Sequence, residues 1–305
     1  MSISLAGTVS SGASGAGTIE FQGLPCTELR LGSGDRLLVA HHGAHVLSWT
    51  TADGVERLYL SPRALMDGAS PIRGGVPICF PQFNMRSLGK APLPKHGFAR
   101  TMPWSLRGLQ MSPDAAEVRL GLQDDASSRA VWPHGFVATW TLRLAPGSLR
   151  MEFAVQNTGV QPWSFALALH TYLRVADIAQ TRLLGLQGLR YWDGVQHLQQ
   201  PDVRLTEAQD ALAFGSETDR VYEQIQGPLT VQQPSGVVRL TQSASLPEAV
   251  VWNPAAARCA AIEDMPANGW QNMLCVEAAC VNNPVLLVPG QAWSGWQVLE
   301  VLQNK

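Results

Sequence analysis

Two ionisable residues interrupt apolar stretches of this chain in a way that would suit proton transfer. His170 comes at or near the end of an apolar strand in WSFALALHTYLRVADI (163–178), and Glu277 follows an apolar run in NMLCVEAACVNNP (272–284). Histidine exchanges a proton near neutral pH, and burial raises the pKa of a carboxyl group and makes it a better base. The two residues are candidates for a general acid and a general base. The alternatives are a core histidine bonded to a carbonyl and an edge-strand glutamate facing water.

A second candidate region is the segment PIRGGVPICFPQFNMRSLGKAPLPKHGFAR (71–100). Glycine permits positive φ and close backbone approach, whereas proline fixes φ and removes a hydrogen-bond donor. The segment therefore cannot form a regular helix or the middle of a sheet. We expect an ordered loop that forms one wall of a binding site. The polar side chains that it would present are Arg73, Gln82, His96 and Arg100.

Two further stretches could border the same site. Asp219 lies in GSETDRVYEQI (215–225), just before an apolar alternation, and its alternative interpretation is a solvated turn aspartate. The stretch 250–273 begins with a strand that ends at Trp252-Asn253-Pro254, and the loop after it is long enough to line a pocket.

Motifs for cofactors are absent from the sequence. There is no phosphate-binding Walker loop, no dinucleotide fingerprint and no G-x-S-x-G nucleophile elbow. The histidines lack the H-x-H or H-E-x-x-H spacing of a zinc site. We therefore expect no cofactor and no metal, although a metal-dependent sandwich of the cupin kind remains an alternative.

The elements that must position these residues are short strands. VATWTLRL (137–144) and LRMEFAVQ (149–156) alternate apolar and polar residues around Pro146-Gly147, which predicts an antiparallel hairpin with one buried face. Only 205–214 could hold a few helical turns. Many short strands separated by turn residues indicate an all-β sandwich or barrel. The other predicted strands are 36–41, 45–50, 117–123, 163–169, 182–186, 229–233, 237–242, 248–252, 273–278, 285–288 and 293–302.

Composition restricts the class of protein further. Charged residues are 15% of the chain and the net charge is −2, so there is no basic stripe for a nucleic acid. The five cysteines form no C-x-x-C pair, which favours a reducing, cytoplasmic location. The N-terminus lacks the features of a signal peptide, and no apolar run approaches the ~20 residues of a membrane span. We expect a monomer with a mobile tail over 1–18 and a single domain over 19–305.

Six segments together resemble the aldose 1-epimerase superfamily, and most closely its hexose-6-phosphate branch, the glucose-6-phosphate 1-epimerases. They follow the order of the family across nearly the whole chain after the tail. Departures are confined to connecting segments: Asn84 after the PQF motif, the 256–271 loop, and Cys280. The matching segments are 60–83, 93–100, 165–178, 217–222, 250–254 and 272–279.

The resemblance implies a large antiparallel β-sandwich of the galactose-mutarotase type, with the active site in a cleft on one sheet. It implies that His170 is the general acid and Glu277 the general base, and that Asp219 contacts sugar hydroxyls. Arg73 and Arg100 fall on the two arginines that the family associates with the substrate phosphate. Gln82 and His96 match positions that line the site.

The leading hypothesis is an isomerase that interconverts the α and β anomers of a hexose 6-phosphate. Ring opening and reclosure of a cyclic hemiacetal need only an acid and a base, so no cofactor is required. A second hypothesis is an epimerase of neutral aldoses, in which the arginines are structural. A third is a sugar-phosphate binding module without turnover, although a binding protein has no need of a paired acid and base.

Overall fold

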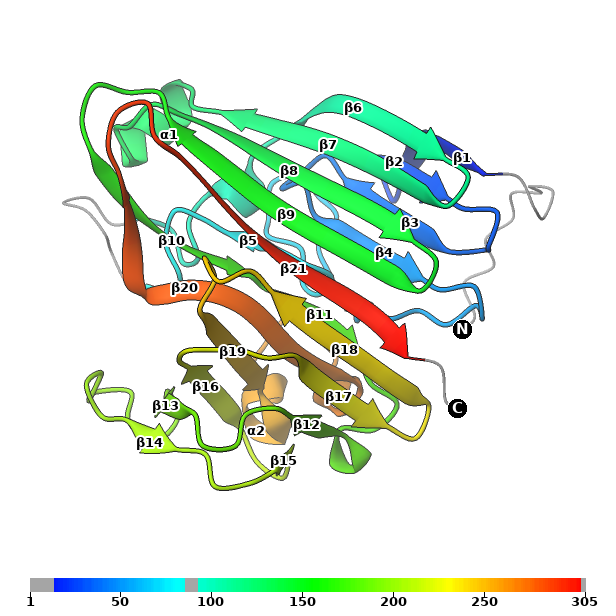
Figure 1. Ribbon diagram of the computed structural model, residues 1–305, viewed down its shortest axis with the longest axis vertical. Helices are drawn as coiled ribbons and strands as arrows, with labels where there is room; N and C mark the ends of the chain where they lie inside the picture. The colour runs from blue at the N-terminus through cyan, green and yellow to red at the C-terminus, as the bar shows by residue number, and fades with distance from the viewer. Residues whose placement is uncertain (1–13, 86–92, 303–305) are drawn as a thin grey trace.

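The computed structural model describes residues 14–85 and 93–302, and its strands form three sheets. The strand pairings within the sheets are antiparallel (Figure 1). The sequence-based expectation of an all-β, antiparallel fold is confirmed. Among the described residues, no helix is both long enough and apolar enough to cross a membrane.

The sheets contain four, eight and nine strands. The first has the order β1–β2–β3–β4, with bounds Gly15–Phe21, Leu24–Arg30, Arg36–Ala40 and Val46–Thr50. The second has the order β14–β13–β16–β19–β20–β10–β5, with bounds Leu205–Thr206, Arg190–Asp193, Thr218–Tyr222, Glu248–Asn253, Met273–Leu287, Trp163–Leu169 and Ile78–Cys79, and β11 (Tyr172–Arg174) also pairs with β20. The third has the order β15–β12–β17–β18–β21–β9–β8–β7–β6, with bounds Ala211–Ala213, Arg182–Leu184, Leu229–Gln233, Gly236–Gln242, Ala292–Leu302, Ser148–Asn157, Phe136–Ala145, Ala115–Gln123 and Ser105–Ser112.

Helices are few and short. The α-helices are α1 (Ala126–Val131) and α2 (Ala255–Ala260), and the 3₁₀ helices are η1 (Ala99–Thr101), η2 (Ile178–Gln180) and η3 (Gly269–Asn272). The carboxylate of Asp125 accepts from the backbone N–H of Ser128 and the Ser128 hydroxyl accepts from that of Asp125, so a capping box starts α1. Helix α2 lies in the loop after Pro254, beside the strands β16 and β19 in Figure 1.

The predicted hairpin is confirmed as β8 and β9. Trp140 pairs with Phe153 across it, and inward residues alternate with outward residues along both strands. Two other expectations are wrong. The segment 205–214 forms the short strands β14 and β15 instead of a helix, because its few apolar residues are used in sheet pairing. Strand β1 begins at Gly15, so the end of the expected tail pairs with β2, and residues 1–13 lie outside the described part.

The hydrophobic core lies between the sheets. Trp140 and Phe153 from the nine-stranded sheet, Leu167 and Val276 from the eight-stranded sheet, and Trp49 from β4 belong to one buried cluster. Burying each large apolar side chain contributes about 1.5–3 kcal/mol. Because successive residues of a strand point to opposite faces, the residues between these core positions in the eight-stranded sheet face away from the core. That outer face is where polar groups gather.

The segment 71–100 forms irregular structure, as predicted, apart from β5 and the start of η1; its residues 86–92 are not described. At some of its glycines, the backbone of this segment packs directly against other backbone atoms. Gly97 has a φ of 71°, and a Cβ at this position would lie 2.0 Å from the carbonyl oxygen of Phe80. The backbone N–H of Phe98 then donates to that same carbonyl at 3.0 Å. Glycine is therefore required here for both conformation and space.

Gly97→Ala should destabilise the fold more than Gly54→Ala. Both glycines have positive φ, but a Cβ at Gly54 would meet no atom within 4 Å. The change at Gly54 should lower the free energy of unfolding by about 1–2 kcal/mol through backbone strain alone. The change at Gly97 adds a backbone clash and should cost a further ~1–3 kcal/mol. Urea unfolding measures both, and equal losses would contradict the close approach.

Candidate active site

The two candidate acid–base residues stand opposite each other on neighbouring strands. Strand β10 ends with Leu169 paired to Ala278 of β20, and after two intervening residues β11 resumes the same register, with Tyr172 paired to Cys275. His170, in the break between β10 and β11, is therefore directly opposite Glu277. The backbone N–H of His170 donates to the carbonyl oxygen of Pro77 at 3.0 Å, which ties the break to the loop wall.

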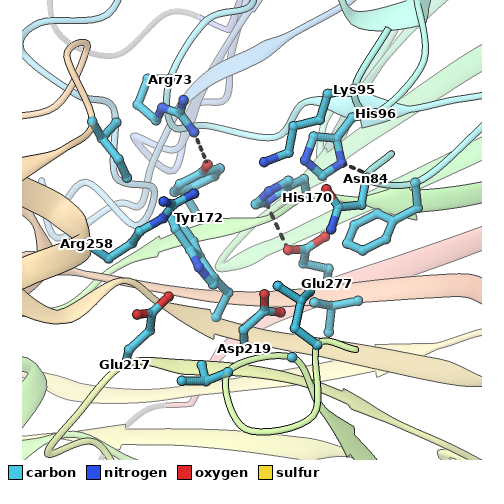
Figure 2. Close-up of a pocket in the computed structure, with 17 residues that line it drawn as sticks. Arg73, Asn84, Lys95, His96, His170, Tyr172, Glu217, Asp219, Arg258 and Glu277 are labelled. Atoms are coloured by element: carbon cyan, nitrogen blue, oxygen red, sulfur yellow. Dashed lines mark hydrogen bonds and ion pairs between the residues drawn. The ribbon is translucent and has the colours of Figure 1, made fainter. Parts of the chain in front are cut away.

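The side chains of this pair are in contact and almost completely buried. Nδ1 of His170 lies 3.0 Å from Oε1 of Glu277, and the exposed fractions of the two residues are 7% and 1% (Figure 2). Neither Nδ1 of His170 nor Oε2 of Glu277 has a hydrogen-bond partner of good geometry in the described part of the chain. Within that part, Nδ1 of His170 contacts only the carboxyl group of Glu277, and Oε2 of Glu277 is left to accept a hydrogen bond from a ligand.

Burial shifts the pKa values of the two groups toward each other. It raises the pKa of Glu277 well above the usual range, and the nearby carboxylate of Asp219 raises it further. It lowers the pKa of His170 well below the usual range, and nearby cations, Arg73 first among them, lower it further. Burial thus favours the uncharged form of each group, a neutral imidazole and a protonated carboxyl.

A second row of side chains shares the face of Glu277. Asp219 of β16 pairs with Trp252 of β19, Trp252 pairs with Cys275 of β20, and Cys275 pairs with Tyr172 of β11. Directly paired residues share one face of a sheet, and Glu277 is two residues beyond Cys275 on β20. The carboxylate of Asp219 and the aromatic rings of Trp252 and Tyr172 therefore lie on the same face of the sheet as His170 and Glu277. The ring of Tyr172 stacks on the imidazole of His170 with centroids 4.7 Å apart.

Asp219 is a titratable group in its own right. Burial raises its pKa to about 6; Glu217 acts in the same direction and Lys95 opposes it. Gly194 gives its carboxylate room, because a Cβ there would lie 3.0 Å from that carboxylate. The N–H of Gly194 also donates to the Asp219 carbonyl at 2.6 Å.

The loop wall contributes a neutral histidine. The backbone N–H of Asn84 donates to Nδ1 of His96 at 3.1 Å, so Nε2 carries the proton of the neutral ring. Burial lowers the pKa of His96 well below its usual range, and the positive charges around it add to this effect. His96 has a φ of 63°, an uncommon conformation that turns its side chain toward the site. It can donate one hydrogen bond without carrying charge.

Three cations border the cavity. Arg73 donates from Nε to Asp264 at 3.0 Å and from Nη1 to the hydroxyl of Tyr172 at 3.2 Å. The side chains of Lys95 and Arg258 are exposed and form no hydrogen bond or ion pair within the residues that the structure covers. Lys95 is exposed at the surface but partly enclosed by its neighbours, and this partial burial, together with the positive charges of Arg258 and Arg73, lowers its pKa. Cations that repel one another around a cavity favour an anionic ligand.

These groups enclose a cavity of about 510 Å³. Figure 2 shows His170 and Glu277 near its centre, Asp219 and Glu217 along one side, and the cations Arg73, Lys95 and Arg258 around it. The other lining residues are Phe83, Asn84, His96, Tyr172, Gly194, Val195, Leu198, Val250, Trp252 and Ile262. A cavity of this size is within the usual range for small-molecule sites.

The structure brings together five of the seven residues that the sequence singled out. Those that line the cavity are Arg73, His96, His170, Asp219 and Glu277. Gln82 and Arg100 are not among the residues that line it. Gln82 donates to the carbonyl oxygens of Leu93 and Pro94, and Nη2 of Arg100 donates to that of Lys95 at 2.6 Å. Both side chains hold the loop wall, because an irregular segment leaves carbonyl groups that no sheet satisfies.

The sequence analysis missed several lining residues. Lys95 directly precedes His96, and its charge beside a candidate site residue was an available signal. Arg258 lies on α2, inside the loop that was expected to border a pocket, but nothing in its local pattern marks it. Tyr172 could have been found from its spacing, since it follows His170 by two residues and so shares its face.

His170, Cys275 and Glu277 also place possible ligand atoms within 4.8 Å of one another. A histidine, cysteine and glutamate set could coordinate zinc. The thiol of Cys275 is fully buried, and burial raises its pKa well above the usual range. Metal binding would have to remove that proton, so the set opposes ligation near neutral pH.

The chain is similar in sequence to known proteins. A protein from Cenchrus ciliaris named "Putative glucose-6-phosphate 1-epimerase" is 35% identical over 263 residues, covering 83% of this chain and 78% of that protein. One of the same name from Escherichia coli strain K12 is 32% identical over 243 residues, covering 79% and 78%. The match to the aldose 1-epimerase family model spans residues 25–300.

Solved structures confirm the expected type of fold. A crystal structure titled as a "putative mutarotase" from Salmonella typhimurium has a TM-score of 0.85 and 25% identity, covering 95% of this chain and 94% of that one. Galactose 1-epimerase from Lactobacillus acidophilus NCFM has a TM-score of 0.75 at 15% identity, covering 97% and 100%. The architecture is therefore the antiparallel sandwich of the galactose-mutarotase type. By the extent of these matches, the chain belongs to the aldose 1-epimerase family.

Proposed function

We propose that this protein interconverts the α and β anomers of a hexose 6-phosphate, with glucose 6-phosphate as the first candidate. The observation that carries the proposal is the combination of a buried acid–base pair with cations around the same cavity. The names of the relatives point to the same substrate. A cytoplasmic monomer remains the expectation from the sequence.

The reaction requires two proton transfers at neighbouring oxygens of the sugar. Glu277 removes the proton of the anomeric hydroxyl while His170 donates a proton to the ring oxygen, and the C1–O5 bond opens to the free aldehyde. Rotation about C1–C2 and reclosure on the other face give the other anomer, with the protons returned in reverse. Each positioned group of this kind typically contributes about 10²–10⁴ in rate.

Neighbouring side chains would orient the sugar ring. The carboxylate of Asp219 accepts from ring hydroxyls, and Nε2–H of His96 donates to an oxygen of the substrate. Trp252 and Tyr172 offer apolar surface on the same face of the sheet. Orientation of the reacting atoms can supply several kcal/mol of the rate enhancement.

The phosphate group would lie among Lys95, Arg258 and Arg73. Lys95 and Arg258 form no hydrogen bond with residues 14–85 or 93–302, whereas Arg73 uses Nε and Nη1 for Asp264 and Tyr172 and can offer its remaining N–H groups. Charge-assisted hydrogen bonds of this kind are stronger than neutral ones. These positive charges would stabilise a bound phosphate dianion. A free hydroxymethyl group at the same place carries no charge and would not require them.

Phosphate binding would also raise the pKa of His170 and so favour its acidic, protonated form. The positive charges of Arg73, Arg100 and Lys95 help to keep the pKa of His170 low, whereas the pKa of Glu277 is set by burial and Asp219. A bound dianion offsets those positive charges and so raises the pKa of His170 more than that of Glu277. The shared proton then moves toward His170, which leaves an acidic imidazolium beside a basic carboxylate.

One observation favours a second candidate, an epimerase of neutral aldoses. Arg73 is paired with Asp264, and Arg100 is bonded to the backbone of Lys95, so both arginines have structural partners. In that case the cavity would accept glucose or galactose as readily as their phosphate esters. The role of Lys95 and Arg258 separates the two candidates.

Freshly generated α-glucose 6-phosphate should reach anomeric equilibrium faster with this protein than in buffer, as followed by one-dimensional exchange NMR. Glu277→Gln and His170→Ala should each lower the rate by at least about 10²-fold, because each removes one proton transfer. Glu152→Gln on β9 is the matched control and should leave the rate unchanged. Dialysis against EDTA should also leave it unchanged.

Parallel samples decide among the alternatives. Equal acceleration of free glucose would establish the neutral-sugar candidate in place of the phosphate ester. No acceleration of either sugar, with thermal stabilisation by glucose 6-phosphate, would identify a binding module. Full activity of both the Glu277 and His170 variants would contradict the proposed mechanism.

Lys95→Gln and Arg258→Gln should each raise KM for glucose 6-phosphate about 3- to 10-fold, with kcat less affected. Both cations are exposed, so their contribution is partly screened and should decrease as salt rises. Arg119→Gln on β7 is the control, because its exposed arginine does not line the cavity. An unchanged KM in both variants would show that these cations do not bind the phosphate.

The pH profile of kcat/KM should fall below about pH 6, where the carboxylate of Asp219 gains a proton and ceases to be a pure acceptor. The substrate phosphate also titrates in this range, so the assignment needs a variant. Glu217→Gln removes a negative charge that raises the pKa of Asp219, and should move the decline to lower pH. A profile that does not move in this variant would assign the decline to the phosphate.

A further inference from the structure

A buried glutamine crosses the core directly behind the acid–base pair. Gln297 belongs to β21 of the nine-stranded sheet and is only 1% exposed. It is paired with Met151 of β9, and its neighbour Leu299 on the same face is a core residue. A polar amide in an apolar core requires partners, because an unpaired buried donor or acceptor is destabilising.

Both partners of this amide lie across the core: Val276 in β20 of the eight-stranded sheet, and Thr171 in the break between β10 and β11. The hydroxyl of Thr171 donates to Oε1 of Gln297 at 2.6 Å, and Nε2 of Gln297 donates to the carbonyl oxygen of Val276 at 3.1 Å. The N–H of Val276 donates in turn to the carbonyl oxygen of Thr171 at 3.1 Å. These three hydrogen bonds close a cycle that links the two sheets.

The hydrogen bonds of this cycle end on the residues that adjoin the proposed acid and base. Thr171 follows His170, and Val276 precedes Glu277. Because neighbouring residues of a strand face opposite sides, His170 and Glu277 point into the cavity while Thr171 and Val276 point to the core. The regular strand assignment is interrupted at His170 and Thr171, between β10 and β11. The amide of Gln297 thus provides side-chain bonds at a point where the sheet itself is interrupted.

We propose that Gln297 and Thr171 form a positioning pair that sets the separation of His170 from Glu277. Neither residue lines the cavity, so neither touches the substrate. Their effect would come through the backbone of the two residues that carry the acid and the base. This proposal rests on the proposed function for its kinetic consequences, but its geometry does not depend on which sugar is the substrate.

Alternative explanations of the buried amide are weaker. A contribution to stability alone would not require the hydrogen bonds to end on residues adjacent to both members of the pair. Asn157 provides the comparison: it is fully buried and donates to the carbonyl oxygens of Gln161 and Leu287, at the end of β20 far from Glu277. It holds the same strand without reaching the site.

The test replaces each member of the pair and compares it with the distant amide. Gln297→Leu and Thr171→Val remove the cycle while keeping similar volumes, and Asn157→Leu is the control for lost stability. Gln297→Leu and Thr171→Val should lower kcat about 10- to 100-fold with KM nearly unchanged, because small displacements of reacting groups have large effects on rate. Thr171→Ser keeps the hydroxyl and should retain most of the activity.

A second measurement follows the imidazole of His170 directly by ¹⁵N NMR as pH is varied. In Gln297→Leu and Thr171→Val, the pKa of His170 should move toward its ordinary value, whereas in Asn157→Leu it should stay at the wild-type value. If the Asn157 control loses as much kcat as the two cycle variants at equal loss of thermal stability, the positioning role is refuted. An unchanged kcat and an unchanged His170 titration in both cycle variants would also overturn it.

The two proposals fail in different ways. If the wild-type protein accelerates no sugar, the proposed function is wrong, and the NMR titration still decides whether Gln297 and Thr171 hold His170. If the wild type is active and the cycle variants match it, only the positioning role is lost. Should Gln297→Leu not fold, Thr171→Val and Thr171→Ser carry the comparison by themselves.

Discussion

The contact between His170 and Glu277 is the interaction on which the site depends. Two ionisable groups on neighbouring strands are almost completely buried, and their nearest atoms are 3.0 Å apart. Burial penalises the charged form of each group, so the pair is sensitive to any charge placed near it. Asp219 acts on the carboxyl and the surrounding cations act on the imidazole. The position of a single proton can therefore respond to what occupies the cavity.

Positive and negative groups come from different parts of the fold. The carboxylates of Asp219 and Glu277 lie on the central strands β16 and β20, whereas Arg73, Lys95 and Arg258 lie on the loop wall and on α2. The carboxyl groups and the cations of this cavity thus come from separate segments of the chain, and they act on one another across it.

Sequence patterns predicted the parts of this site that lie on strands or at their ends. His170 and Glu277 were visible because each interrupts an apolar run, and the hairpin of β8 and β9 followed from alternation. Loop residues were harder, since no periodicity relates Arg258 to a partner far away in the sequence. Arg100 carried the right charge, but the direction of its side chain depends on backbone carbonyls that only the folded loop supplies. The inward direction of Gln297 likewise depends on long-range register.

The proposed acid and base lie on or beside regular strands, whereas the cations lie on irregular segments and on α2. The fold thus assigns the proposed proton transfer and the proposed substrate recognition to different elements. His170 and Glu277, the proposed acid and base, are held opposite each other by the register across β10, β11 and β20, where a slip of one strand by one residue would turn its side chain into the core. The cations lie on irregular segments, where substitution and change of length are tolerated more easily. On the proposed function, a change of substrate would involve residues of the loop wall or of α2, whereas ring opening would depend on the pairing of the two strands. The interrupted strand at His170 is the weak point of such an arrangement, because its geometry depends on side-chain hydrogen bonds as well as on the sheet.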